Sequence, residues 1–226
     1  MALSPGLSSF DLVLPAPPVA LAAQLSVPPG ASGLVVFVHG SGSNRLSPRN
    51  LAVAEVLQQG GLATLLFDLH ADVEPTGGDG QADDPMLLSQ RLLMVLRHLK
   101  RAGGCSDGCS VDVSSLPLGL FGASSGAAVA LAAAAEQPEL VGAIVSRGGR
   151  PDLVVGALGG VRAPTLLLVG SHDVDVLELN CWASAQLQCR HELRVVPGAG
   201  HLFAEPGALD CVARWSRLWF LEHLRS

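Results

Sequence analysis

Residues 116–126 have the sequence LPLGLFGASSG, and residues 127–133 continue it as AAVALAA. An apolar segment is followed by the pattern Gly-x-Ser-x-Gly and then by small residues that favour a helix. A nucleophile elbow, in which a serine projects from a strained turn between a strand and a helix, requires this order. Gly122 and Gly126 lack the side chains that would collide where strand and helix pass closely. A chain with 26 glycines can match the pattern by chance, but the flanking segments predict such a turn at Ser124.

Strand-like and helix-like segments alternate from residue 34 onward. Apolar runs predict strands at Leu34–Val38, Leu62–Phe67, Leu116–Phe121, Leu140–Val145, Thr165–Val169 and Glu192–Val196. Helices are predicted from Pro48 to the Gly60-Gly61 pair, from Pro85 to Arg101, and at Asp152–Leu158, Val174–Gln188 and Pro206–Leu224. Two earlier strands, Phe10–Leu14 and Leu21–Val27, flank a proline-rich turn. The pattern predicts an α/β fold: a mostly parallel twisted sheet with helices on both faces and an N-terminal antiparallel hairpin at its edge.

The composition favours one compact domain, residues 1–226, because no repeat or low-complexity linker divides the chain. Hydrophobic residues make up 49% of the chain. The formal net charge is -6, and this negative charge does not favour binding to nucleic acid or to anionic membranes. No apolar run reaches the roughly 18 residues of a membrane helix. The N-terminus has no cationic segment before an apolar one, so we expect no signal peptide and a cytoplasmic location.

Neither a cofactor nor a metal is expected; Cys105 and Cys109 could pair, bind metal or be two free thiols.

Polar residues that can perform chemistry follow several of the predicted strands. In sheets of this kind, sites form at the carboxyl ends of the strands. A serine hydroxyl is a weak nucleophile at neutral pH and needs a base, whose orientation a carboxylate fixes. The chain supplies these groups in the order Ser124, Asp173 and His201, each after a predicted strand. We therefore predict Ser124 as nucleophile, His201 as base and Asp173 as the acid that orients it.

Each assignment has an alternative. Asp175 and, less directly, Asp152 compete with Asp173 for the role of the acid, and Asp173 could instead cap the helix after it. Ser124 could be an ordinary turn residue, and His201 a surface histidine in its loop. The other histidines lack a matching context, and we expect them to lie at the surface or in packing: His70, His98, His172, His191 and His223.

Two backbone segments are candidates for an oxyanion hole. The amide of Ser125 lies at the start of the predicted helix, and Gly40 or Ser41 supplies the second donor from the loop after the first parallel strand. His39 is expected to organise this loop rather than to act as the base, and it is also a possible substrate-binding residue. Asp68, at the end of the next strand, is expected to make a structural hydrogen bond.

Four segments resemble a known family: VFVHGSGS at 36–43, FGASSG at 121–126, VSRGGRPD at 145–152 and GHLF at 200–203. On these segments the chain resembles the α/β-hydrolase superfamily and, within it, the dienelactone-hydrolase-like serine hydrolases. The resemblance covers almost the whole chain. It implies an α/β-hydrolase fold, with Ser124, Asp173 and His201 as nucleophile, acid and base. Dienelactone hydrolase itself uses a cysteine as nucleophile, so Ser124 favours ordinary ester chemistry over its lactone substrate.

The segment Ser146–Pro164 is too short to form the cap domain that many α/β-hydrolases carry before the strand with the acid. We therefore expect no cap, an open pocket and a small-molecule substrate with a small or exposed ester.

The acidic loop Asp68–Asp84 could form one wall of this pocket or be solvated. Arg147 and Arg150 could recognise a substrate carboxylate, or could pair with Asp152 or the acidic loop. A carboxylesterase-like reaction through an acyl-enzyme is expected; acyl transfer, perhydrolysis and a non-catalytic binding role are the alternatives, and the oligomeric state is open.

Overall fold

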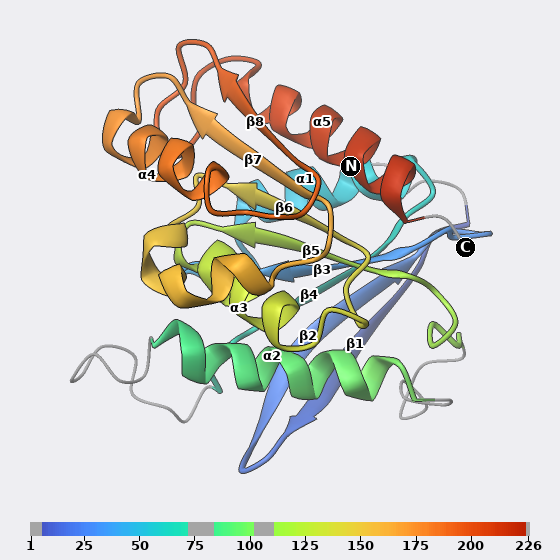
Figure 1. Cartoon of the computed structure of the whole chain (residues 1–226). Helices are drawn as coiled ribbons and strands as arrows, with labels where there is room; N and C mark the ends of the chain where they lie inside the picture. Colours follow the sequence, from blue (N-terminus) through green and yellow to red (C-terminus); the bar gives the residue numbers. More distant parts are fainter. Residues whose placement is uncertain (1–5, 72–83, 102–110, 225–226) are drawn as a thin grey trace.

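The computed structural model describes residues 6–71, 84–101 and 111–224 (Figure 1). In these residues eight strands form one sheet, in the order β1-β2-β4-β3-β5-β6-β7-β8. The strands are β1 (Ser8–Ala16), β2 (Val19–Val27), β3 (Leu34–Val38), β4 (Ala63–Phe67), β5 (Leu118–Ala123), β6 (Ala143–Arg147), β7 (Thr165–Gly170) and β8 (His191–Val196). The helices are α1 (Pro48–Gln59), α2 (Pro85–Leu99), α3 (Ser125–Glu136), α4 (Val174–Ser184) and α5 (Ala208–His223), with a 3-10 helix η1 (Pro151–Gly160).

The sheet is parallel from β4 to β8 in the spatial order, and β1 and β2 form an antiparallel hairpin that joins it through β4. The arrows of β5 to β8 point the same way in Figure 1, so their carboxyl ends share one edge. This arrangement confirms the predicted mostly parallel sheet with an N-terminal antiparallel hairpin. It also places the segments that follow β3, β5, β6, β7 and β8 at a common edge.

Helices cover both faces of the sheet, as predicted. The apolar side chains of α1 and α5 pack on one face, where Val53, Leu57 and Phe220 belong to a single buried cluster. The cluster on the other face includes side chains of α2, α3, η1 and α4. Because β3, β4, β5 and β7 are buried on both faces, their sequences are mainly continuous apolar runs rather than alternating ones.

Several element boundaries differ from the predicted ones. β5 begins at Leu118 rather than Leu116, since Pro117 has no N–H to donate to a neighbouring strand. β6 begins at Ala143 rather than Leu140, whose N–H instead donates to Gln137 O (3.1 Å) in a turn, and β6 extends to Arg147. α5 begins at Ala208 rather than Pro206, after Gly207 with φ 77°. α4 ends at Ser184 rather than Gln188, because the chain passes into a tighter turn after it.

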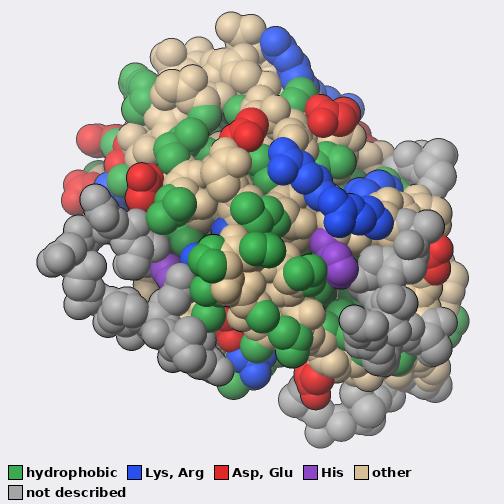
Figure 2. All heavy atoms as spheres, turned by 90° about the horizontal axis from the view of Figure 1, so that it is seen from below, with side chains coloured by type: hydrophobic (Ala, Val, Ile, Leu, Met, Phe, Trp, Pro, Cys, Tyr) green, Lys and Arg blue, Asp and Glu red, His purple; other side chains and the backbone are tan. Residues whose placement is uncertain are grey.

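The surface mixes side chains of every kind. Viewed from the side where α2 lies, hydrophobic, acidic and basic side chains occur next to one another (Figure 2). Met86, Leu87 and Met94 of α2 are among the exposed hydrophobic residues. None of the helices within the described ranges combines the length and apolarity needed to cross a membrane.

Candidate active site

β5 and α3 hold Ser124 at the carboxyl edge of the sheet. Ser124 has φ 53° and ψ -124°, a positive φ that non-glycine residues rarely adopt. Such strain costs on the order of 1–3 kcal/mol and persists only where the surroundings hold it. Here the Ser124 N–H donates to Arg147 O (3.0 Å), and Ser124 O accepts from the N–H groups of Ala127 (3.1 Å) and Arg150 (3.2 Å). The turn therefore presents a half-buried hydroxyl from a fixed backbone.

The two glycines of the motif allow this turn. A Cβ on Gly122 would lie 2.4 Å from Ala127 Cα, and one on Gly126 would lie 2.3 Å from Val38 O. Both contacts are with backbone atoms, which cannot move aside as the end of a side chain can. The close approach of α3 to β3 and β5 thus depends on the absence of these side chains.

Asp173 and His201 come together from the loops after β7 and β8. Asp173 Oδ2 lies 2.6 Å from His201 Nδ1. Asp173 occupies the N-cap position of α4, yet its side chain makes no capping hydrogen bond, so helix capping does not account for it. Because a carboxylate only accepts hydrogen bonds, Nδ1 of His201 carries the shared hydrogen. His201 Nε2 then faces Ser124, whose Oγ lies 3.3 Å away.

The competing carboxylates lie elsewhere. Asp175 is exposed in the first turn of α4. Asp152 accepts two hydrogen bonds from the Arg150 guanidinium, from Nε (2.9 Å) and Nη2 (2.7 Å). These bonds lower the pKa of Asp152 below its ordinary value. Of the three candidates, only Asp173 contacts His201 in the described residues.

The loop after β3 packs directly against the elbow. A Cβ on Gly40 would lie 3.1 Å from Ser124 Cβ and 3.0 Å from Ala123 O. The Ser41 N–H donates to Ser125 Oγ (2.9 Å), and the two serine hydroxyls lie 3.2 Å apart. Of the three predicted oxyanion donors, the Ser41 amide is therefore occupied by a hydroxyl that an oxyanion would have to replace. The Ser125 amide lies at the start of α3, where backbone N–H groups point out of the helix.

His39 and Asp68 organise the neighbouring loops. The Leu69 N–H donates to His39 Nε2 (2.9 Å), so the hydrogen is on Nδ1, which donates to Gly40 O (3.0 Å). Asp68 accepts from the Arg45 N–H (2.6 Å) and pairs with the Arg45 guanidinium. These contacts connect the loops that follow β3 and β4.

Arg147 and Arg150 have different surroundings. Arg150 pairs with Asp152, which is one of the expected pairings. Arg147 is buried, and its guanidinium carbon lies 5.9 Å from the centre of the Phe203 ring. Nε and Nη1 of Arg147 donate no hydrogen bond to any described residue. The pKa of Arg147 is lowered to about 10, first by burial and then by the charge of Arg49, which is not among the predicted site residues.

Some sequence-based expectations concern residues outside the described ranges. They are the carboxylates Asp72, Glu74, Asp79 and Asp83 of the acidic loop, and the thiols Cys105 and Cys109. The last carboxylate of that loop, Asp84, caps α2 by accepting from the Met86 N–H (2.9 Å). Within the described ranges no group of three or more His, Cys, Asp or Glu side chains is arranged to hold a metal ion.

The fold is similar to those of solved structures. Dienelactone hydrolase from Anabaena variabilis ATCC 29413 is 46% identical, with a TM-score of 0.91, and the match covers 97% of this chain and 99% of that one. The protein Est1E from Butyrivibrio proteoclasticus is 18% identical, with a TM-score of 0.77 over 95% of this chain and 98% of that one. The second similarity concerns the fold alone.

Curated relatives are longer than this chain. Two proteins from Mycobacterium tuberculosis strains, each named "Putative phosphoribosyl transferase", are 48% identical over 223 residues. The match covers 99% of this chain but 48% of each relative, so the chain spans about half their length. No family model matches the sequence.

Proposed function

The chain belongs to the dienelactone hydrolase family of the α/β-hydrolase superfamily, and we propose that it is a serine-dependent carboxylic ester hydrolase. The observation that carries the proposal is the line of contacts from Asp173 Oδ2 to His201 Nδ1 (2.6 Å) and from His201 Nε2 to Ser124 Oγ (3.3 Å). The first distance is well within the reach expected for such a pair, and the second is at its long end, as is common for catalytic hydrogen bonds without substrate.

The first half of the reaction uses these three side chains. Ser124 Oγ attacks the ester carbonyl carbon while His201 Nε2 takes the hydroxyl proton. Asp173 stabilises the imidazolium that results. When the tetrahedral intermediate collapses, the bond from carbon to the alcohol oxygen breaks, and the alcohol leaves with the proton from His201. The acyl group then remains on Ser124.

The second half returns the enzyme to its starting state. A water molecule attacks the acyl carbon and loses a proton to His201 Nε2, and the acid leaves as the proton returns to Ser124. In both halves the negative oxygen is stabilised by the Ser125 amide at the α3 N-terminus and by the Gly40-Ser41 backbone. A contribution from the Ser41 amide requires Ser125 Oγ, now 2.9 Å from it, to turn away.

We propose small or exposed esters as substrates. The segment between β6 and β7 forms η1, which packs against α3 and α4 and makes no separate cap. Ser124 and His201 are both partly exposed. A small hollow beside the elbow is lined by Gly40, Ser41, Leu88 and Ser125 among others, but Ser124 and His201 do not line it.

We do not propose the phosphoribosyl transfer named for the curated relatives as the activity of this chain. That name describes proteins of which the chain covers 48%, and the contacts at Ser124 fit acyl transfer to water. The chemistry is tested by hydrolysis of short-chain aryl esters, with Ser124→Ala as the matched variant. We expect the wild type to hydrolyse them and Ser124→Ala to lose at least about a thousandfold in kcat. Full activity in Ser124→Ala, or none in the wild type, would contradict the proposal.

A further inference from the structure

The Arg147 side chain is a buried cation without a counter-charge. The residue is 8% exposed, and Nε and Nη1 have no hydrogen-bond partner among the described residues. A charge removed from water in this way is destabilising unless another group pairs with it. The nearby face of Phe203 offers an attraction, but its ring accepts no hydrogen bond in the plane of the guanidinium.

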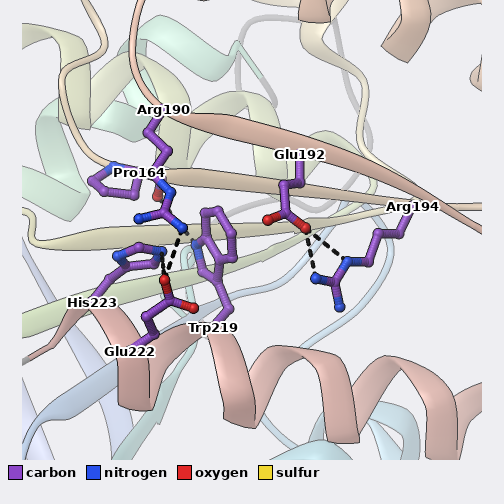
Figure 3. Close-up of polar contacts among 7 residues, drawn as sticks. All are labelled: Pro164, Arg190, Glu192, Arg194, Trp219, Glu222 and His223. Atoms are coloured by element: carbon purple, nitrogen blue, oxygen red, sulfur yellow. Dashed lines mark hydrogen bonds and ion pairs between the residues drawn. The ribbon is translucent and has the colours of Figure 1, made fainter.

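Several other arginines among the described residues do have carboxylate partners. In the groove between β8 and α5, Arg190 pairs with Glu222 (2.8 Å) and Arg194 with Glu192 (2.6 Å), as Figure 3 shows. These two arginines lie at the surface, where water would solvate them even without a carboxylate. Arg147, by contrast, is buried, which is the less favourable place for an arginine without a carboxylate partner.

The surroundings of Arg147 add positive charge. Arg49, in the first turn of α1, is close enough to lower the pKa of Arg147, and its Nε is also buried without a partner among the described residues. The first turn of α1 contains no acidic residue, and Ser47 at the N-cap makes no side-chain capping bond. The first helical bond is donated by Leu51 to Ser47 O (3.0 Å), which leaves the amides of Arg49 and Asn50 available.

We propose that Arg147, Arg49 and the first turn of α1 form a binding site for a phosphate group. Two guanidinium groups and a helix N-terminus together suit a divalent oxyanion better than a monovalent carboxylate. A phosphate also carries enough acceptor oxygens for several guanidinium and amide donors at once. At neutral pH inorganic phosphate retains a hydroxyl, and a phosphate ester retains one in part of its population. The buried Oδ1 of Asn50, which lacks a partner in the described residues, can accept from that hydroxyl.

The site lies next to the proposed catalytic residues. The Arg147 carbonyl accepts from the Ser124 N–H (3.0 Å), and a Cβ on the following residue, Gly148, would lie 3.4 Å from the His201 ring. Phe203, which faces the Arg147 guanidinium, follows His201 by two residues and has a φ of 53°. The phosphate group could therefore belong to the substrate of this site or be free inorganic phosphate.

Thermal unfolding of the full chain tests the binding. Inorganic phosphate, compared with chloride at the same ionic strength, is expected to raise the wild-type Tm by about 3 °C or more. Arg147→Met should abolish this rise. In chloride alone its Tm should equal or exceed that of the wild type, because a buried unpaired charge is removed. Arg150→Met, which removes a neighbouring arginine already paired with Asp152, is the matched control and should keep the full rise.

The site is disproved if phosphate gives the wild type no rise beyond that of chloride, or if Arg150→Met loses the rise as fully as Arg147→Met. Should Arg147→Met fail to fold, Arg49→Met, which alters a partly exposed side chain, replaces it. Calorimetric titration with inorganic phosphate is then expected to give at least a tenfold weaker Kd than in the wild type. An unchanged Kd in Arg49→Met would count against the site.

A kinetic comparison identifies the source of the phosphate group. It uses the acetyl esters of glycerol 3-phosphate and of glycerol, and it rests on the proposed esterase function, whereas the thermal shift does not. If the substrate carries the phosphate, Arg147→Met lowers the ratio of kcat/KM between the two esters at least tenfold. If free phosphate is the ligand, the ratio stays within about twofold while the thermal shift is lost. Absence of all ester hydrolysis together with a phosphate shift would contradict the proposed function and leave this site intact.

Discussion

His201 Nδ1 lies 2.6 Å from Asp173 Oδ2, while Asp175, two residues along the chain, points into solvent from the first turn of α4. An amide in place of the Asp173 carboxylate can present a donor to Nδ1 and so favour the wrong tautomer of the imidazole. We predict that Asp173→Asn lowers kcat toward short aryl esters by about 10³ to 10⁴ with little change in KM. Asp175→Asn should retain at least half the wild-type kcat. An equal or greater loss in Asp175→Asn would refute the assignment of the acid.

Gly126 is predicted to be essential for the stability of the elbow. A Cβ at this position would lie 2.3 Å from Val38 O, so Gly126→Ala must displace the backbone of β3 or α3. We expect a loss of about 3 kcal/mol in the free energy of unfolding, measured by urea denaturation. Gly156→Ala is the control, since its Cβ would meet no atom within 4 Å. Similar stability of the two variants would show that α3 is not held as closely as described.

The Ser125 hydroxyl is predicted to position the loop that carries Ser41. It accepts from the Ser41 N–H (2.9 Å) and lies 3.2 Å from the Ser41 hydroxyl. Ser125→Ala keeps the Ser125 amide but releases this loop, so we expect kcat to fall by roughly tenfold. Loss of a whole oxyanion donor would cost about 10² to 10³. Steady-state kinetics separate the two cases, and an increase in kcat would mean that the hydroxyl instead blocks the Ser41 amide.

The Arg150–Asp152 pair is predicted to make a small, pH-dependent contribution to stability. The pKa of Asp152 is lowered in the folded chain by hydrogen bonds from Arg150, relative to its ordinary value of 3.8. Its contribution is therefore present above pH 3.8 and is lost as the pH falls through the lower folded value. Because the pair is near the surface, Asp152→Asn should cost at most about 1 kcal/mol at pH 7.

Urea denaturation of the wild type and Asp152→Asn at several pH values between 7 and 3 tests this prediction. The difference between the two proteins should narrow as the pH falls below about 4. A difference that stays constant across this range would show that the carboxylate charge of Asp152 is not involved.

The sequence predicted the strands correctly where every residue of the strand is both apolar and buried. Leu34–Val38 was predicted with the bounds that the structure has, because every residue of this run lies inside and is apolar. The start of β6 was misplaced because the hydrophobic run at Leu140 belongs partly to a turn. Its end was missed because Ser146 and Arg147 are polar, although both are buried within the strand. A hydrophobicity pattern identifies buried apolar residues and cannot identify buried polar ones.

The part of the candidate site that could be predicted is the part that the order of the strands alone brings together. Ser124, Asp173 and His201 follow three strands whose carboxyl ends meet at one edge, so their proximity followed from the strand order. The occupied Ser41 amide and the charge interaction between Arg49 and Arg147 depend on the direction of side chains within loops and helix ends. One signal did exist for Arg49: a basic residue in the first turn of a helix opposes the helix dipole.

The most direct test is covalent labelling of Ser124. An aryl fluorophosphonate transfers its phosphonyl group to an activated serine and releases fluoride, which leaves a mass increase that peptide mass spectrometry can locate. The account predicts stoichiometric labelling on Ser124 in the wild type, a rate reduced at least a hundredfold in His201→Ala, and no label at this peptide in Ser124→Ala. Labelling of another serine at the wild-type rate, or of Ser124 at the same rate without His201, would contradict it.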